Sequence, residues 1–431
     1  MKSSDLPGRE RMARPAILVV APSHGFPSTK ARWERPSELI RRLVAGGAAC
    51  DLVVLEEKPL HPFERELIDE LQSWTRRFEV VPHPAVDSFV YQSLAHLKDA
   101  LSLRPRVGGR AHCPARLLSC LRSLQAVEDY RAVIVLGAQL ARCLSVFPDW
   151  TEKLIDLPRI ASDSCQDHAQ GGRADGVDVL WTRAEELALL SAADTVLVGS
   201  QADAARLREL GFAKDLVLAP PTGGPGAERA VAEALRFARP VRPPRLVCLA
   251  SETIANLDGI RWFRRQVFPR IVRAVPTCRL RLLGEAARHI EPGVSVDRIG
   301  WVERLGEEYR DAAVVVLPLR MGAGVRRRAV EALAHGKALA TTSRGAQGTR
   351  LVHLRDAIVT DEPDVFAGEV IRALESDIVR TSYERRALQM ARDAFAPEKA
   401  FRSLELHLGL EESLREAAEK SAGALAGAAG P

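Results

Sequence analysis

The residues best suited to chemistry lie together in the second half of the chain, within residues 315–337. An apolar run is followed by a Gly-Ala-Gly sequence, Gly322, Ala323 and Gly324, and then by a helical pattern with arginines at positions 326–328. Glycines let a ligand approach the backbone closely, and the N-terminus of a helix offers N–H groups to a phosphate. Because arginines at that end oppose the helix dipole, the pattern suggests that an anion binds there.

Glu331 lies three residues after Arg328, so the two side chains share one face of the predicted helix. A carboxylate at this place could accept hydrogen bonds from the two hydroxyls of a ribose. The same spacing is as typical of a solvated Arg–Glu pair on the surface of an ordinary helix. The spacing alone therefore leaves a ligand-binding interpretation and a structural one open.

Alternating strand and helix patterns predict the scaffold that positions these residues. Continuous apolar strands separated by amphipathic helices are typical of a parallel sheet covered on both faces. In the first half, strands are predicted at residues 16–20, 51–55, 78–82, 132–136, 153–156 and 195–199. In the second half, strands are predicted at residues 245–250, 279–283, 294–299, 314–318 and 338–342, and helices at 259–274, 305–311 and 326–335.

Proline and glycine residues separate the two halves, at residues 220–226 and again at Pro240, Pro243 and Pro244. Two similar α/β halves joined in this way predict a cleft between Rossmann-like domains, where ligands bind at the carboxyl ends of strands. The predicted organisation is a flexible N-terminus (1–14), a first domain (15–220), a linker (221–244), a second domain (245–396), a C-terminal helix that packs back toward the first domain (397–418) and a flexible tail (419–431).

The composition is that of an ordinary globular protein. The 431 residues are 46% hydrophobic and 27% charged, which predicts about two or three domains. No apolar run approaches the roughly 20 residues that span a bilayer, and no apolar stretch follows the charges of the first residues, so we expect a cytoplasmic protein. The net charge of +5 is carried mostly by scattered arginines, which argues against a nucleic-acid partner.

The cysteines and histidines do not form a pattern typical of a metal site. None of the seven cysteines belongs to a CxxC pair, and no histidine lies at zinc-binding spacing beside them. Buried free thiols in a reducing compartment are the expected state. The cysteines are Cys50, Cys113, Cys120, Cys143, Cys165, Cys248 and Cys278.

Residues 315–337 resemble the nucleotide-sugar signature of group 1, family 4-like retaining glycosyltransferases of the GT-B fold. That signature combines a Gly-rich loop, a Lys or Arg, a Glu-Ala pair and a Gly-Lys-Pro sequence before a strand. Further similarity lies at residues 246–251, 256–263, 267–269, 281–284, 299–302 and 342–348, and at 192–200 in the first half. The resemblance covers roughly residues 15–410. It implies two Rossmann-like, doubly wound α/β domains that face each other across a cleft.

The resemblance also implies a donor site in the second domain. Arg328 then contacts the donor diphosphate and Glu331 the nucleotide ribose, and both are candidate catalytic residues. The other donor-binding candidates are Gly322, Ala323 and Gly324 behind the sugar phosphate, Val302 near the base, Ser251 and Asn256 in the first strand and helix of the nucleotide domain, and Gly25 in the first-strand loop. Ala323 departs from the family's two-glutamate form, which has a glutamate there, and Ala338 replaces the signature proline.

The acceptor side is marked less clearly. His24, Asp156 and Asp163 are candidates for a base that activates the acceptor, and Ser200 is a further acceptor-side candidate. Either aspartate could as easily cap the next helix. Relatives tend to show an acidic residue or a histidine shortly after residue 156, where this chain has Arg159.

The resemblance implies a hexosyltransferase-type enzyme that moves a sugar from a UDP- or GDP-sugar to a glycan or lipid-linked acceptor, as in polysaccharide biosynthesis. No metal and no cofactor beyond the nucleotide sugar is expected, because Arg328 and the helix N-terminus would neutralise the leaving diphosphate. The alternative is a catalytically degenerate GT-B-like protein that binds nucleotides or acts as a scaffold. An NAD-linked oxidoreductase is excluded, because no GxGxxG sequence follows a predicted strand.

Membrane association is a separate question that the first half of the chain raises. Its arginines could contact acidic lipids at the inner face of the cell membrane, or they could form an ordinary solvated basic face. The residues concerned are Arg104, Arg106, Arg110, Arg116 and Arg122.

Overall fold

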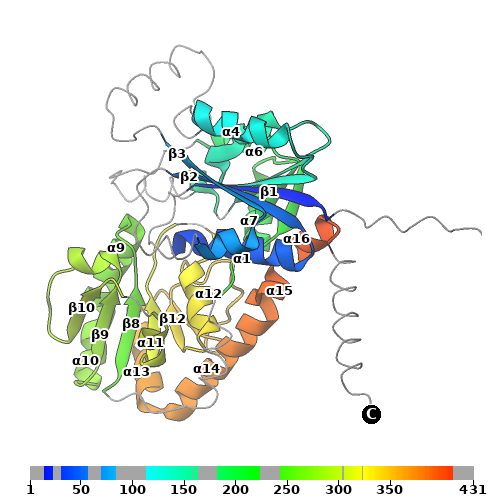
Figure 1. Ribbon diagram of the computed structural model, residues 1–431. Helices are drawn as coiled ribbons and strands as arrows, with labels where there is room; N and C mark the ends of the chain where they lie inside the picture. Colours follow the sequence, from blue (N-terminus) through cyan, green and yellow to red (C-terminus); the bar gives the residue numbers. More distant parts are fainter. Residues whose placement is uncertain are drawn as a thin grey trace, which may run out of the picture.

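The computed structural model describes residues 14–22, 31–56, 69–83, 113–157, 159–163, 182–223, 243–302, 305–322 and 324–410. These residues form two α/β domains, each built on one parallel sheet with helices around it (Figure 1). The predicted fold class is therefore confirmed.

The N-terminal domain contains a seven-stranded parallel sheet in the order β3-β2-β1-β4-β5-β6-β7. Its strands are β1 (Ala16–Pro22), β2 (Ala49–Glu56), β3 (Arg77–Pro82), β4 (Ala132–Leu136), β5 (Glu152–Leu157), β6 (Thr195–Val198) and β7 (Asp215–Leu218). Alternate residues of β1 enter opposite cores, Leu18 and Val20 on one face and Ile17 and Val19 on the other. Because both faces are buried, these strands are continuous apolar runs. The edge strand β7 is short and partly exposed, and it was not predicted.

The C-terminal domain contains a six-stranded parallel sheet in the order β10-β9-β8-β11-β12-β13. Its strands are β8 (Arg245–Leu249), β9 (Arg279–Leu283), β10 (Val296–Gly300), β11 (Val314–Leu317), β12 (Leu339–Thr341) and β13 (Ile358–Val359). Here too the two faces of the sheet lie in separate apolar cores, since Val314 and Val316 pack into one and Val315 and Leu317 into the other. The two-residue β13 is too short to produce a sequence pattern, and it was not predicted.

Helices cover both sheets (Figure 1). The N-terminal domain has α1 (Ala31–Ala45), α4 (Ala115–Gln125), the 3₁₀ helix η1 (Ala138–Val146), α6 (Arg183–Leu190) and α7 (Gln201–Glu209). The C-terminal domain has α9 (Ile254–Trp262), the π-helical turn η2 (Phe263–Val267), α10 (Phe268–Ala274), the 3₁₀ helix η3 (Glu285–His289), α11 (Leu305–Arg310), α12 (Arg327–Ala334), α13 (Pro363–Glu375), α14 (Asp377–Met390) and the π-helical turn η4 (Ala391–Phe395). Within the described residues, no helix has both the length and the apolar character needed to cross a bilayer.

The helix predicted at residues 259–274 differs from the observed one. The observed helix begins earlier, at Ile254. The Thr253 side chain caps its N-terminus by accepting a hydrogen bond from the backbone N–H of Asn256 (3.4 Å). The π-helical turn η2 then separates α9 from α10. The earlier start places the first turn of α9 directly after the carboxyl end of β8.

After η4 the chain returns to the N-terminal domain. The short helices α15 (Pro397–Ala400) and α16 (Arg402–His407) lie against α1 and the N-terminal sheet (Figure 1). Phe401, Leu404 and Leu408 are buried in the same core as Leu39 of α1. Within the described residues, the segment before α15 connects the C-terminal domain back to the N-terminal one.

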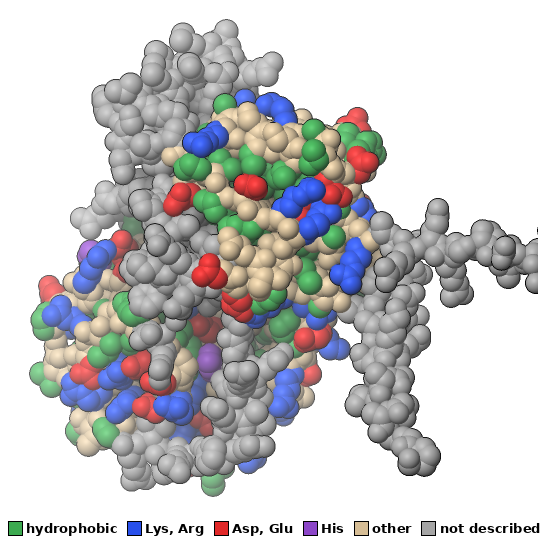
Figure 2. All heavy atoms as spheres, viewed as in Figure 1, with side chains coloured by type: hydrophobic (Ala, Val, Ile, Leu, Met, Phe, Trp, Pro, Cys, Tyr) green, Lys and Arg blue, Asp and Glu red, His purple; other side chains and the backbone are tan. Residues whose placement is uncertain are grey.

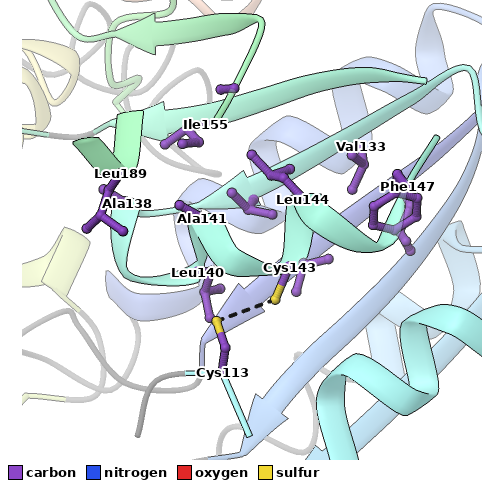
Figure 3. Close-up of a cluster of buried hydrophobic side chains, with 14 of the residues drawn as sticks. Cys113, Val133, Ala138, Leu140, Ala141, Cys143, Leu144, Phe147, Ile155 and Leu189 are labelled. Atoms are coloured by element: carbon purple, nitrogen blue, oxygen red, sulfur yellow. Dashed lines mark hydrogen bonds between the residues drawn. The ribbon is translucent and has the colours of Figure 1, made fainter. Parts of the chain in front are cut away.

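Most cysteines of the described residues lie in the cores as free thiols. Cys50, Cys113, Cys143, Cys248 and Cys278 are buried, and Cys120 is partly exposed. Figure 3 shows the Cys113 and Cys143 side chains pointing toward each other, with 3.7 Å between the two Sγ atoms. All six are free thiols and five are buried as expected, whereas Cys120 is partly exposed. Cys165 lies outside the described residues.

We expect the buried thiols to resist alkylation in the native protein. Burial raises the pKa of Cys50, Cys248 and Cys278 to about 12. The pKa of Cys143 is also raised, mainly by its hydrogen bond with Cys113 and also by burial. Because the thiolate is the reactive form, iodoacetamide at pH 8 should label these four residues more slowly than in urea, by on the order of tenfold or more. Timed labelling and peptide mass spectrometry give each rate, and equal native and urea rates would contradict the expectation.

Candidate functional site

The strand order of the C-terminal sheet reverses between β8 and β11. From β8 the sheet extends through β9 to β10 on one side, whereas β11 pairs with the other side of β8. In doubly wound sheets, ligands bind outside the carboxyl ends of the strands at such a point. The loops after β8 and β11 contain Ser251 and residues 318–326, so the topology brings the predicted donor-binding segments to one edge.

Two glycines allow these loops to pack closely. A Cβ atom at Gly259 of α9 would lie 2.2 Å from the carbonyl oxygen of Pro318, directly after β11. A Cβ atom at Gly284 would lie 2.4 Å from the carbonyl oxygen of Ala250, and Gly284 has a positive φ of 84°. Any larger residue at either place would push apart the segments that follow β8, β9 and β11.

The loop before α12 uses the conformational freedom of its glycines. Gly322 and Gly324 both have positive φ angles, 94° and 83°. The guanidinium group of Arg326 lies across this loop and donates hydrogen bonds to the carbonyl oxygens of Met321 and Arg344, each at 3.4 Å. Ala323 lies outside the described residues.

The N-terminus of α12 has no side-chain cap. Arg326 is the N-cap residue, it makes no capping hydrogen bond, and the first turn contains no acidic residue. A helix start of this kind is suited to receive an anion, because the dipole and the N–H groups of the first turn favour negative charge.

Arg328 and Glu331 form the contact that their spacing predicts. The Arg328 Nη1 donates a hydrogen bond to Glu331 Oε2 at 2.6 Å. The side chain of Glu331 is only 9% exposed and that of Arg328 is 24% exposed. Burial of the carboxylate distinguishes this pair from the fully solvated surface pair that the same spacing allowed, so the pair is partly enclosed.

Ser251 and Asn256 are held together at the end of β8. The Asn256 Nδ2 donates hydrogen bonds to the backbone oxygen of Ser251 (3.1 Å) and to its Oγ (2.9 Å). Val302, after β10, is partly buried against the core that also contains α12. These residues and the Arg328–Glu331 pair therefore all belong to segments that follow β8, β10 and β11.

The lysine of the signature has a structural role and is not part of the donor-binding candidates. Lys337 is buried, and its Nζ donates hydrogen bonds to the backbone oxygens of Arg310 (3.0 Å) and Ala312 (3.2 Å), at the end of α11. Burial lowers the pKa of this amine. Lys337 thus connects the C-terminal end of α12 with α11 through hydrogen bonds, and it lies at the opposite end of α12 from Arg328.

Asp156 is held by an arginine that sequence reasoning did not single out. Arg35 of α1 donates from Nε to Asp156 Oδ2 (3.0 Å) and from Nη2 to Oδ1 (2.8 Å), and both side chains are buried. Two charged hydrogen bonds occupy both oxygens of this carboxylate and fix its orientation. Asp163 is similarly held by Arg206, at 2.8 and 3.1 Å. Both aspartates therefore have arginine partners, which favours the structural interpretation over a role as acceptor base.

Ser200 caps α7. Its Oγ accepts from the backbone N–H of Asp203 (3.1 Å) and donates to Asp203 Oδ2 (2.7 Å). Burial raises the pKa of Asp203, while the Ser200 hydrogen bond and the charge of Arg326 act in the opposite direction. Ser200 lies at the boundary with the other domain, because a Cβ atom on Gly348 would lie 3.2 Å from the Ser200 Cβ. The remaining first-domain candidates, His24 and Gly25, lie outside the described residues.

The three consecutive arginines have different partners. Arg326 donates to backbone oxygens of its own loop and of Arg344, Arg327 forms an ion pair of 3.6 Å with Glu38 of α1, and Arg328 pairs with Glu331. The anion that faces Arg327 is thus a carboxylate of the N-terminal domain. Within the described part of the chain, no group of three or more His, Cys, Asp or Glu side chains is arranged to hold a metal ion.

Comparisons with known proteins agree with this geometry. Residues 243–376, which include the whole C-terminal sheet and α12, match the family described as glycosyl transferases group 1. An uncharacterised 44.6 kDa protein in the cps region of Klebsiella pneumoniae is 21% identical over 161 residues, and the match spans 35% of this chain and 42% of that protein.

Solved structures of similar architecture match over nearly the whole chain. Sucrose-phosphate synthase from Thermosynechococcus elongatus is 16% identical with a TM-score of 0.62, over 94% of this chain and 100% of that one. HepE from Anabaena, solved with UDP and glucose, is 13% identical with a TM-score of 0.59, over 91% and 99%. TarM is 9% identical with a TM-score of 0.60, over 93% and 99%. The chain has the GT-B fold of these structures.

Proposed function

We propose that this protein is a glycosyltransferase that transfers a sugar from a nucleoside diphosphate-sugar to a glycan or lipid-linked acceptor. The observation that carries the proposal is the partly enclosed Arg328–Glu331 pair, which lies in the first turns of α12, after a glycine loop and at the edge where β8 and β11 end. The match of residues 243–376 to group 1 glycosyl transferases supports it.

The proposed chemistry is positioning combined with electrostatic stabilisation of the leaving diphosphate. Arg328 and the uncapped N-terminus of α12 would neutralise the charge that develops as the sugar leaves. Glu331 would accept hydrogen bonds from the ribose hydroxyls, and the bond from Arg328 to its Oε2 would keep the carboxylate oriented. Because Arg328 and the helix supply positive charge, the proposed reaction needs no metal.

We propose a UDP- or GDP-sugar as the donor, and a retaining, hexosyltransferase-type reaction as the resemblance implies. The structural neighbour HepE, solved with UDP and glucose, supports a nucleotide-sugar site in this fold. Main-chain contacts near Val302 would select the base. The curated relative is named for a cps region, which supports a role in polysaccharide biosynthesis.

We also propose a cytoplasmic location with peripheral contact at the inner face of the cell membrane. Arg116 and Arg122 of α4 are exposed. On the face seen in Figure 2, however, lysine and arginine side chains are interspersed with acidic ones over both domains. Co-sedimentation with acidic vesicles at low and physiological salt tests this contact, and absence of binding at both would exclude it.

Nucleotide binding and turnover test the proposed function in two steps. Thermal shift and calorimetry with UDP and GDP show whether the donor site exists. Hydrolysis of UDP- and GDP-sugars, monitored by the release of free nucleotide, then shows whether the site is catalytic. Binding without turnover of any donor would favour the catalytically degenerate alternative, and binding of neither nucleotide would exclude a nucleotide-sugar site.

Glu331→Gln is expected to weaken nucleotide binding by about 1.5–3 kcal/mol, the usual value of a hydrogen bond to a charged group. The substitution keeps the size of the side chain but removes the charge that strengthens hydrogen bonds from the ribose hydroxyls. Calorimetric titration with the nucleotide that binds the wild type measures the change.

Glu308→Gln is a matched control for this variant. Glu308 of α11 also accepts hydrogen bonds from an arginine, Arg281 of β9, at 2.8 and 2.6 Å. Its replacement should leave nucleotide affinity unchanged. If Glu331→Gln also binds with wild-type affinity, Glu331 is only a partner of Arg328.

A further inference from the structure

The first turn of α12 lies at the boundary between the two domains. Figure 1 shows α1 of the N-terminal domain next to α12 of the C-terminal domain. Val325, just before α12, contacts both sides: its Cγ2 lies 3.4 Å from the place of a Cβ on Gly199 and 2.7 Å from that of a Cβ on Gly348. The residues that lead into the candidate donor site are therefore packed against the other domain.

An ion pair joins the domains at the next turn. Glu38 of α1 lies 3.6 Å from Arg327 of α12, with side chains 4% and 20% exposed. Water screens such a pair less than it would a surface pair, so its electrostatic attraction is stronger. Arg327 occupies a helix N-terminus, where a positive charge is unfavourable, and the carboxylate of Glu38 offsets that cost.

Arg35, one turn earlier on α1, anchors the helix that carries Glu38. Besides its bonds to Asp156, Arg35 donates to the backbone oxygens of Ala219 (2.8 Å) and Pro220 (3.0 Å), where the chain leaves β7. Its guanidinium group also lies 4.7 Å from the ring centre of Phe401, where the chain returns from the C-terminal domain. The segment that leaves β7 and the segment that returns from the C-terminal domain thus both contact the helix that carries Glu38.

We propose that Glu38 is a positioning residue for the donor site. Through Arg327 it holds the first turn of α12 in the orientation in which Arg328 and Glu331 receive the nucleotide sugar. The N-terminal domain thereby contributes to donor affinity through a side chain that does not touch the donor. This inference rests on the proposed function, and it adds an interdomain contact to the donor site.

A double-mutant cycle with Glu38→Gln and Arg327→Gln tests the coupling. Each single variant should bind the nucleotide about five- to thirtyfold more weakly, the range of one to two kcal/mol. The nucleotide affinity of the double variant should be no lower than that of the more affected single variant, because either single change already breaks the ion pair. Arg327→Lys keeps the charge and should retain most of the affinity. The donor KM should rise more than kcat falls.

The ion pair between Arg41 of α1 and Glu70 provides a matched control. It involves the same helix, with 2.8 Å between the charged atoms, but it stays within the N-terminal domain. Glu70→Gln should leave nucleotide affinity unchanged. Small-angle X-ray scattering of Glu38→Gln should also show a larger radius of gyration than the wild type, whereas Glu70→Gln should not.

The outcomes separate this inference from the proposed function. If wild-type protein binds the nucleotide and Glu38→Gln binds it equally well, the positioning role is wrong and the proposed function stands. Losses that multiply in the double variant would also overturn the coupling. If the wild type binds neither UDP nor GDP, the proposed function fails, and the role of Glu38 in donor binding fails with it.

Discussion

Arg328→Ala is expected to lower the turnover number by about two orders of magnitude or more, the scale of other electrostatic donors at reacting centres. Negative charge builds on the β-phosphate as the sugar leaves, so the contact with Arg328 is stronger in the transition state than in the ground state. Donor binding should therefore weaken much less than turnover. Steady-state kinetics with the donor that the wild type uses, combined with calorimetric affinity, separate the two effects.

Neighbouring variants make this expectation specific. Arg328→Lys should restore much of the activity, because a point charge can serve one phosphate. Arg326→Ala and Arg327→Ala should have smaller effects on turnover, since Arg326 reaches the carbonyl oxygens of its own loop and Arg327 pairs with Glu38. Equal losses at all three arginines would indicate a diffuse basic patch. Full activity of Arg328→Ala would remove the central support for the site.

Asp156→Ala is expected to destabilise the protein by about 3–5 kcal/mol, the usual cost of removing one partner from a buried ion pair. The change leaves the buried guanidinium group of Arg35 without the carboxylate that holds it at 2.8 and 3.0 Å. The charge of Asp156 also raises the pKa of Arg35, although burial by itself acts in the opposite direction. Urea denaturation followed by circular dichroism measures the loss.

Asp163→Ala is the matched control for this effect. Asp163 accepts a similar pair of hydrogen bonds from Arg206, but these side chains are 19% and 33% exposed. Water screens that pair, so its loss should cost about 1 kcal/mol or less. A stable Asp156→Ala variant with low turnover would instead assign Asp156 to the acceptor.

The candidate donor site could be predicted from the sequence because its signals are local. Arg328 and Glu331 are three residues apart, and helix geometry alone brings them to one face. The glycines at 322 and 324 occupy positive φ angles, a conformation that favours glycine. Most strands were predictable for a similar reason, since a strand buried on both faces is a continuous apolar run. The short edge strand β7 and the two-residue β13 lack that signal.

The tertiary structure alone decided which charges meet across the fold. Arg35 and Asp156 are separated by 121 residues, and no spacing rule connects them. The same holds for Glu38 and Arg327, which lie in different domains. The sequence by itself determined two parallel α/β domains and a helix start suited to an anion. Only the assembled structure showed that Arg327 faces a carboxylate of the other domain, because ion pairs between distant segments depend on how the sheets and helices are assembled.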